Sequence, residues 1–283
     1  MNYSEIISSD ILSANLNLKD LVIVDCRFEL KNPEKGYQDY LASHIPGAYY
    51  ANLDKDLASP ATSISGRHPL PDSALFSDLL SRWGVTVNSQ VVVYDQNGGS
   101  LAVRLWWLLN YFGFSRVAVL DGGFSHWLDG NFPVDNQTVQ FHKQDNLPPL
   151  EPNTQMMVPI EEMTALVASP DYLIIDARAE DRYLGKLEPI DKIAGHIPGA
   201  VNRFHGCNLT YEGLFKSPEK LRMEFLSLIG NRPYSKVIVY CGSGVTSCHH
   251  ILSMKMAGIS GPRLYVGSWS EWIQDPSRQI AAL

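Results

Sequence analysis

The fold is predicted from one stretch of sequence, Val237-Ile-Val-Tyr-Cys-Gly-Ser-Gly-Val-Thr246. Its first four residues are β-branched or aromatic, which is typical of a short buried strand. Apolar residues from Ile251 through Met254 to Ala257 recur at the spacing of a helix face, and we expect this helix to begin near the end of the stretch. Cys241 is therefore predicted to lie at a turn between a strand and a helix.

The surroundings of Cys241 favour an ionised thiolate. Gly242 and Gly244 lack a Cβ, so the backbone can curl and direct successive N–H groups toward one point, while the following helix aims its positive dipole end there. Thiolates in such places have pKa values lowered from ~8.5 toward ~3.5 to 7.5. The alternative is a packed, inert cysteine, but flanking glycines suit the approach of a ligand better than they suit packing.

Length and composition limit the possible classes of protein. A chain of 283 residues exceeds the usual size of one domain, so two domains of about 100 to 150 residues are expected. The net charge of −7 predicts no nucleic acid partner. Met1 to Asp10 has no signal-like pattern and no stretch approaches ~20 apolar residues, so we expect a cytoplasmic protein with no membrane partner. The four cysteines lack a Cys-x-x-Cys spacing, and we predict no metal site, disulfide framework or cofactor.

One pattern occurs twice along the chain. The matched segments, in order, are Leu21–Arg27 with Tyr172–Arg178, Ser43–Ala48 with Gly195–Ala200, Val91–Tyr94 with Val237–Tyr240, and Gly123–Trp127 with Ser268–Trp272. The first pair ends in Asp-x-Arg and the second contains His-Ile-Pro-Gly-Ala. Four matches in the same order indicate a duplicated domain.

Each copy alternates β-branched runs with amphipathic stretches. The amphipathic stretches are Ser73–Trp83, Leu101–Phe112, Pro218–Ile229 and Thr246–Ala257. This alternation predicts an α/β fold in which each copy has a mainly parallel sheet flanked by helices. Ligands of such sheets bind at the carboxyl ends of the strands, where Cys241 is predicted to lie.

The two copies differ at the position of the cysteine. Asp95 occupies in the first copy the place that Cys241 has in the second. A carboxylate cannot carry sulfur as a thiolate does, so the first copy is predicted to keep the fold without the chemistry. Prolines between the copies predict a linker. We expect domains at 1–135 and 158–283, joined by a linker at 136–157.

These motifs together closely resemble those of the tandem-rhodanese sulfurtransferases. The likeness covers nearly the whole chain, and the loop beginning at Cys241 is similar to that of the 3-mercaptopyruvate enzymes of this family; thiosulfate-preferring members carry an Arg-Lys pair where this chain has Gly242 and Ser243. The resemblance implies two rhodanese-like domains, the first without a catalytic cysteine. It further implies that Cys241 takes sulfur from a small anionic donor as a persulfide and passes it to a thiol such as thioredoxin, or to cyanide. Thiosulfate remains the alternative donor.

The resemblance also implies roles for individual residues. Arg182 matches the arginine that holds the donor's anionic group, for which a guanidinium fork is suited. Ser243, His68 and Asp54 resemble a Ser/His/Asp relay that could protonate the enolate left when sulfur departs, with Asp56 an alternative to Asp54. The remaining loop residues predicted to contact the donor are Gly242, Gly244, Val245 and Thr246.

One departure from the family pattern concerns the donor's second anchor. Some mercaptopyruvate enzymes have another arginine shortly before the His-Ile-Pro-Gly turn, where this chain has Ile190. Isoleucine cannot bind a carboxylate. Arg203, or Arg104 in the first copy, could provide the missing charge.

Two other classes of function compete with sulfur transfer. Cysteine-dependent phosphatases share a cysteine in an anion-cradling loop, but they need an arginine six positions later, where this chain has Ser247. A binding module that only presents the fold is the third possibility, and the reactive setting of Cys241 disfavours it.

Several conspicuous residues are predicted to be structural. His44 and His196 occupy the same place in the turn of each copy, and the copy without the cysteine keeps its histidine, which favours a structural hydrogen bond over catalysis. The two Asp-x-Arg motifs are expected to form ion pairs at strand ends. His249 and His250 are adjacent on the expected helix and cannot both face one metal. Cys248 is expected to be packed. The tryptophans expected in the core are Trp106, Trp107, Trp127, Trp269 and Trp272.

Overall fold

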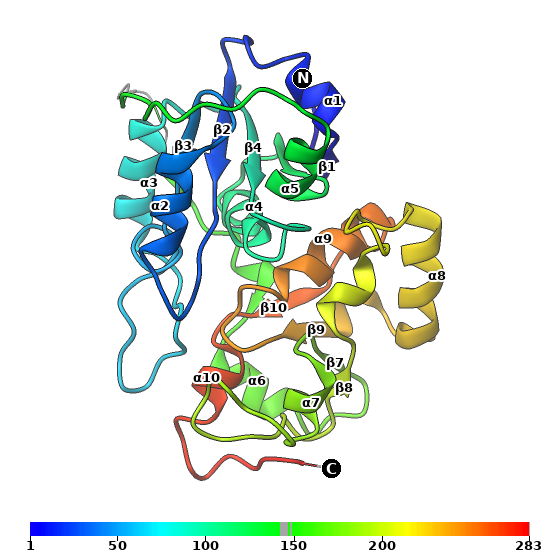
Figure 1. Ribbon diagram of the computed structural model, residues 1–283. Coiled ribbons are helices and arrows are strands. Elements are labelled where there is room, and N and C mark those ends of the chain that lie inside the picture. The colour runs from blue at the N-terminus through cyan, green and yellow to red at the C-terminus, as the bar shows by residue number, and fades with distance from the viewer. Residues whose placement is uncertain (142–146, 148, 283) are drawn as a thin grey trace. The chain divides into compact units, whose positions relative to one another are not determined.

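The computed structural model describes residues 1–141, 147 and 149–282, which form two compact units (Figure 1). The first unit comprises Met1–Ser59, Leu70–Asn153 and Tyr211–Phe215, and the second comprises Pro60–Pro69, Thr154–Thr210 and Lys216–Leu283. Neither unit is continuous in sequence, because the 60–69 segment lies with the second unit and the 211–215 segment with the first. Residues 142–146 and 148 of the predicted linker lie outside the described residues.

The first unit is built on a five-stranded parallel sheet. Its strands, in spatial order, are β1 (Ile6–Ile7), β5 (Val117–Leu120), β4 (Gln90–Tyr94), β2 (Leu21–Asp25) and β3 (Ala48–Tyr50). Its helices are α1 (Ser9–Ser13), α2 (Lys35–Ala42), α3 (Ser73–Arg82), α4 (Ala102–Tyr111) and α5 (Gly123–Asp129). The central strand β4 is buried along its whole length, as expected of a parallel sheet covered on both faces.

The second unit repeats this topology strand for strand. Its sheet runs β6 (Met157–Val158), β10 (Arg263–Tyr265), β9 (Val237–Tyr240), β7 (Leu173–Asp176) and β8 (Val201–Asn202). Its helices are α6 (Ile160–Leu166), α7 (Glu180–Tyr183), α8 (Pro218–Ile229), α9 (Cys248–Met256) and α10 (Ser268–Trp272), with short 3₁₀ turns at Thr154–Met156, His205–Asn208 and Tyr234–Lys236. The predicted α/β fold with two duplicated, mainly parallel sheets is confirmed.

The repeated motifs make the same contacts in both units. The guanidinium of Arg27 pairs with Asp25 at 2.6 Å and donates to the carbonyl of Ser43. Likewise Arg178 pairs with Asp176 at 2.7 Å and donates to a carbonyl that precedes the second His-Ile-Pro-Gly turn. The predicted strand-end ion pairs are confirmed, and each ties its strand to the turn that leads into the neighbouring strand.

The histidines of the two turns are structural, as predicted. Nδ1 of His44 donates to the carbonyl of Tyr40 at 2.6 Å, and Nδ1 of His196 donates to that of Tyr183 at 2.7 Å. Both imidazoles are buried, and each also stacks on a tyrosine ring. The tryptophans predicted for the core are all buried. No helix in the described part of the chain is long and apolar enough to cross a membrane.

Candidate active site

Cys241 lies directly after β9, the middle strand of the second sheet. Its side chain is buried, with 1% of the residue's surface exposed. The following helix, α9, begins at Cys248, near Thr246 as predicted, and the residues just before it direct donors toward the Cys241 sulfur. The loop that carries Cys241 is therefore Cys241–Ser247, and we call it the catalytic loop.

The catalytic loop is held by the start of α10. The N–H of Cys241 donates to the Oγ of Ser268 at 3.1 Å. In return, the N–H groups of Trp269 and Ser270 donate to the carbonyls of Cys241 and Gly242 at 3.0 and 2.9 Å. These bonds hold the N–H and carbonyl of Cys241 and the carbonyl of Gly242, so the backbone that carries the sulfur has a defined position.

Gly244 is required by the path of the loop. Its φ of +73° lies in the left-handed region, and a Cβ built on it would lie 2.2 Å from the carbonyl oxygen of Val266. Any other residue would meet both a backbone strain and a collision with the main chain beside α10.

We therefore expect Gly244→Ala to destabilise the second unit by roughly 2 to 4 kcal/mol, since strain and overlap add. Denaturant unfolding measures the change. Gly199→Ala is the matched control, because Gly199 has a similar φ of +77° but meets only an ordinary contact at 3.6 Å. Equal losses of stability in the two variants would show that the contact with Val266 has no importance.

Hydrogen bonds lower the pKa of the Cys241 thiol. Burial raises this pKa, but it is outweighed by donation from the hydroxyls of Ser247 and Thr246 and from the backbone N–H groups of Ser243 and Ser247. The Oγ of Ser247 lies 3.4 Å from Sγ. The shift has the direction predicted from the glycine-rich turn, and its cause is hydrogen bonding to the charged form.

The lowered pKa gives a testable pH dependence. Thiolate absorbance of wild type minus Cys241→Ser should appear at lower pH in the folded than in the unfolded protein. The stability that accompanies this shift is present above the unfolded pKa and is lost as pH falls through the folded pKa. Ser247→Ala should raise the titration midpoint by about one pH unit, the worth of one hydrogen bond to a charged group.

Ser253→Ala is the control for this titration. Ser253 lies on α9, the helix that follows Ser247, and its buried Oγ has no hydrogen-bond partner in the described residues. A midpoint that stays unchanged in Ser247→Ala would remove the hydroxyl from the causes of the shift.

The structure brings His68 and Ser243 together. Within the second unit, the 60–69 segment packs beside α10 at Gly66, where a Cβ would lie 2.5 Å from the carbonyl oxygen of Gly267. The N–H of Arg67 donates to Ser270 Oγ at 3.0 Å. This anchoring places Nδ1 of His68 2.7 Å from Ser243 Oγ, with both side chains buried. Two members of the predicted relay thus form a hydrogen bond.

The predicted third member, Asp54, belongs to the first unit. It is exposed, and its N–H donates to Asn52 Oδ1 at 2.9 Å. The alternative, Asp56, is half-buried and accepts from the N–H of Asn52 at 2.7 Å. Burial raises the pKa of Asp56.

Arg182 lies over the catalytic loop. Its Nη1 and Nη2 are 3.6 and 3.5 Å from the position that a Cβ on Gly242 would take. Glu188 and Asp191 hold the guanidinium, with contacts of 2.8 and 2.9 Å to Nη2. A second guanidinium, that of Arg67, lies on the same glycine, and the sequence reasoning missed it. The sequence signal that could have indicated Arg67 is its position directly before His68, a predicted site residue.

The arginines predicted as substitutes for a second anchor have other partners. Arg203 pairs with Glu224 at 2.9 Å and lies 4.2 Å over the ring of Phe225; none of its contacts in the described residues is with the catalytic loop. Arg104 is fully buried on α4 in the first unit, where it donates to the carbonyl of Leu57.

The equivalent loop of the first unit is filled by its own carboxylate. Asp95 Oδ1 accepts from the N–H groups of Asn97 and Gly99, and Oδ2 accepts from those of Leu101 and Ala102, at 2.6 to 3.1 Å. Burial raises the pKa of Asp95, and these four bonds oppose it. In both copies, the N–H groups two and six positions after the first loop residue donate to the side chain of that residue. The carboxylate of Asp95 therefore takes the place that the sulfur has in the second copy.

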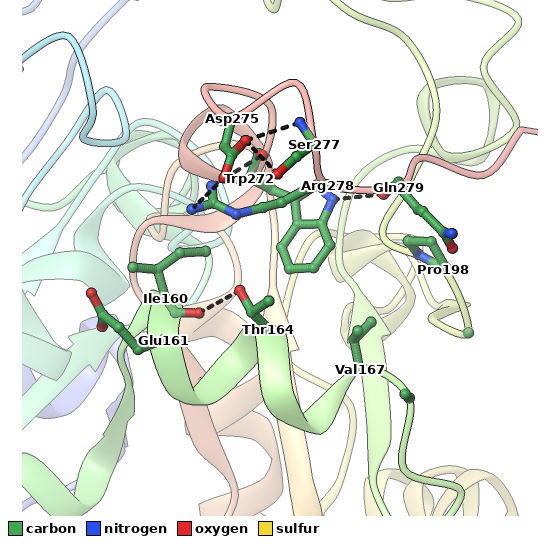
Figure 2. Close-up of a pocket in the computed structure, with 12 residues that line it drawn as sticks. Ile160, Glu161, Thr164, Val167, Pro198, Trp272, Asp275, Ser277, Arg278 and Gln279 are labelled. Carbon is green, nitrogen blue, oxygen red and sulfur yellow. Dashed lines mark hydrogen bonds and ion pairs between the residues drawn. The ribbon is translucent and has the colours of Figure 1, made fainter.

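Other features of the second unit do not contribute to this site. A cavity of about 590 Å³ lies between α6 and the segment after α10; Figure 2 shows Thr164 and Val167 on one wall and Trp272 on the other. Its cation, Arg278, pairs with Asp275 and donates to the carbonyl of Trp272. No residue of the catalytic loop lines it.

Buried histidines on α9 form a separate polar cluster. The amide nitrogen of Asn208 lies 2.9 and 3.0 Å from Nδ1 of His249 and His250, and burial lowers the pKa of His250 well below its ordinary value. Cys248 is fully buried, as predicted. Within the described ranges, no group of three or more His, Cys, Asp or Glu side chains is arranged to hold a metal ion.

Comparison with known proteins finds similarity over the whole chain. The model of the rhodanese-like domain matches twice, at residues 8–129 and 160–275. A probable 3-mercaptopyruvate sulfurtransferase of Pseudomonas aeruginosa is 40% identical over 99% of both chains, and the thiosulfate sulfurtransferase of Bos taurus is 32% identical over 89% of this chain and 84% of the bovine one. The crystal structure of SseA, a 3-mercaptopyruvate sulfotransferase of Escherichia coli, superposes with a TM-score of 0.80 and 28% identity over 95% of this chain and 100% of SseA.

Proposed function

Because this chain belongs to the rhodanese family and is a sulfurtransferase with tandem domains, we propose that Cys241 accepts a sulfur atom from 3-mercaptopyruvate and passes it on as a persulfide. One observation carries this proposal. The thiol whose pKa is lowered lies in the same loop as Ser243, whose hydroxyl is hydrogen-bonded to His68. A nucleophile and a proton source are thus combined in one buried loop.

In the first step the Cys241 thiolate attacks the donor's sulfur. An S–S bond forms, the donor's C–S bond breaks, and the electron pair passes to carbon as the enolate of pyruvate. Ser243 delivers one proton to this enolate and is reprotonated through His68, which gives pyruvate and a Cys241 persulfide. The backbone N–H groups that donate to the Cys241 thiolate stabilise its negative charge before the attack.

In the second step an acceptor takes the outer sulfur. A thiolate attacks it, the S–S bond breaks, and the Cys241 thiolate is regenerated together with an acceptor persulfide. Thioredoxin is the thiol that we propose, and cyanide is an alternative acceptor that gives thiocyanate.

Thiosulfate is the second candidate donor, since the bovine relative is named for it. The hydrogen bond between His68 and Ser243 favours mercaptopyruvate. Sulfite leaves thiosulfate without needing a proton, whereas a carbon leaving group must be protonated, so this pair has a role only with the keto acid.

A direct comparison of kcat/KM tests the choice of donor. Mercaptopyruvate and thiosulfate are each offered with cyanide and with thioredoxin, and we expect mercaptopyruvate to be preferred by at least about tenfold, or 1.4 kcal/mol of transition-state binding. A preference for thiosulfate with both acceptors would overturn the proposal.

The competing functions have less support. Ser247 occupies the position where a phosphatase needs arginine, and its hydroxyl donates to Cys241. A mere binding module does not need a thiol with a lowered pKa. The cytoplasmic location and the domain limits 1–135, 136–157 and 158–283 stay predictions.

A further inference from the structure

Two guanidinium groups cover the catalytic loop at Gly242. A Cβ built on this glycine would lie 3.0 Å from Nη2 of Arg67 and 3.5 Å from Nη2 of Arg182. Both cations therefore lie beside the residue that directly follows Cys241. The glycine leaves this space open.

A single carboxylate positions both cations. Asp191, with 4% of its side chain exposed, accepts from Nη1 of Arg67 through Oδ1 and from Nη2 of Arg182 through Oδ2 at 2.9 Å. Glu188 accepts from Nε of Arg182 at 3.0 Å. These bonds fix the two guanidinium planes relative to each other, which is the preorganisation that recognition of a small planar anion requires.

Three nitrogens of the two guanidinium groups have no acceptor among the residues that the structure describes. Nε of Arg67 is buried without a hydrogen-bond partner in the described residues. Nη2 of Arg67 and Nη1 of Arg182 also form no hydrogen bond within that part of the chain. Together with Nη2 of Arg182, they are the nitrogens nearest the Gly242 position. Nε of Arg67 is therefore a buried charged donor whose burial is costly unless a ligand satisfies it, and the other two nitrogens are open to a ligand.

The charge of the surrounding cluster favours a monoanion. The cluster contains three arginines and three carboxylates, namely Arg67, Arg178, Arg182, Asp176, Glu188 and Asp191. The formal charges of these six side chains therefore cancel, so they offer no excess positive charge to a dianion. A monocarboxylate can use the free N–H groups, while the second negative charge of thiosulfate would face Glu188 and Asp191 without compensation.

We infer that Arg67 is a donor-binding and specificity-determining residue, which with Arg182 binds the carboxylate of a 2-keto acid donor. Arg67 supplies the guanidinium that Ile190 cannot, from a segment far away in the sequence. This inference rests on the proposed function for the identity of the donor, but the binding of a 2-keto carboxylate can be measured without sulfur transfer. The alternative is that Arg67 only forms an ion pair that holds the 60–69 segment.

The test compares Arg67→Met, Arg182→Met and Lys192→Met. Lys192 is the matched control, because it is an exposed cation next to Asp191 and is not among the groups nearest the Gly242 position. Two quantities are measured for each variant: KM for mercaptopyruvate, and the Kd of pyruvate by calorimetry, which needs no turnover. Each arginine variant should raise both by about 10- to 100-fold, the worth of one charge-assisted contact, and Lys192→Met should change neither.

A second measurement separates binding from folding. Arg67→Met should raise KM for mercaptopyruvate at least about tenfold more than KM for thiosulfate, while kcat changes by no more than about threefold. Ile190→Arg added to Arg67→Met should recover pyruvate binding. A merely structural role predicts instead equal losses for both donors, a lower melting temperature and no recovery by Ile190→Arg.

The outcomes distinguish the inference from the proposed function. If wild type turns over mercaptopyruvate and Arg67→Met leaves KM and the pyruvate Kd unchanged, the inference is wrong and the function stands. If wild type binds pyruvate through Arg67 but fails to transfer sulfur from mercaptopyruvate, the carboxylate site stands and the function is wrong.

Discussion

Cys241→Ser is expected to abolish sulfur transfer, lowering kcat by at least about 10³-fold, because a serine hydroxyl cannot form the persulfide. The replacement keeps the size and the hydrogen-bonding capacity of the side chain, so the loop and its bonds to Ser268 and Ser247 should persist. Intact mass after exposure to mercaptopyruvate is the direct measurement. The wild-type chain should gain one sulfur atom, and the variant should gain none.

The other cysteines provide the control for this experiment. Cys207 is exposed and Cys248 is buried, and both are free thiols. Cys207→Ser should gain sulfur and turn over as wild type does. Sulfur found on the Cys241→Ser chain, at any position, with retained turnover would place the nucleophile elsewhere.

His68→Ala and Ser243→Ala should slow turnover of mercaptopyruvate by about 10² to 10⁴-fold, the usual worth of general acid catalysis. Both side chains are buried and form one hydrogen bond of 2.7 Å, so the loss of either interrupts the same proton transfer. The double variant should therefore be little worse than each single one. Steady-state kinetics with thiosulfate is the comparison, and there the losses should be much smaller, since sulfite leaves as an anion.

Two further variants test the third member of the relay. Asp54→Ala or Asp56→Ala should reproduce part of the His68→Ala defect with mercaptopyruvate, and the one that does identifies the carboxylate. Equal slowing with both donors in His68→Ala and Ser243→Ala would mean that the pair supports the loop rather than transfers a proton.

The duplication and the strand–turn–helix arrangement around Cys241 could be predicted because both depend on short contiguous segments of the sequence. The strand before Cys241 and the glycines after it specify a strand, a turn and a helix through local backbone preferences, and the structure has them in this order. The donation from Ser247 to the sulfur was not predicted, because it is a contact between loop residues rather than a propensity. Asp95 was predicted as the mark of the inactive copy, but the four N–H groups that enclose its carboxylate are visible only in three dimensions.

The environment of the sulfur was decided by tertiary structure. Gly66 packs against Gly267, and this contact carries Arg67 and His68 to a loop that lies more than a hundred positions away in the sequence. No periodicity or local motif encodes such an approach, because it depends on two backbones that meet where neither has a Cβ. The sequence by itself determined the duplicated fold, and it predicted Cys241 as the nucleophile and Asp95 as its counterpart in a copy without that chemistry. Only the tertiary structure decided which cation stands beside Arg182 where Ile190 offers none.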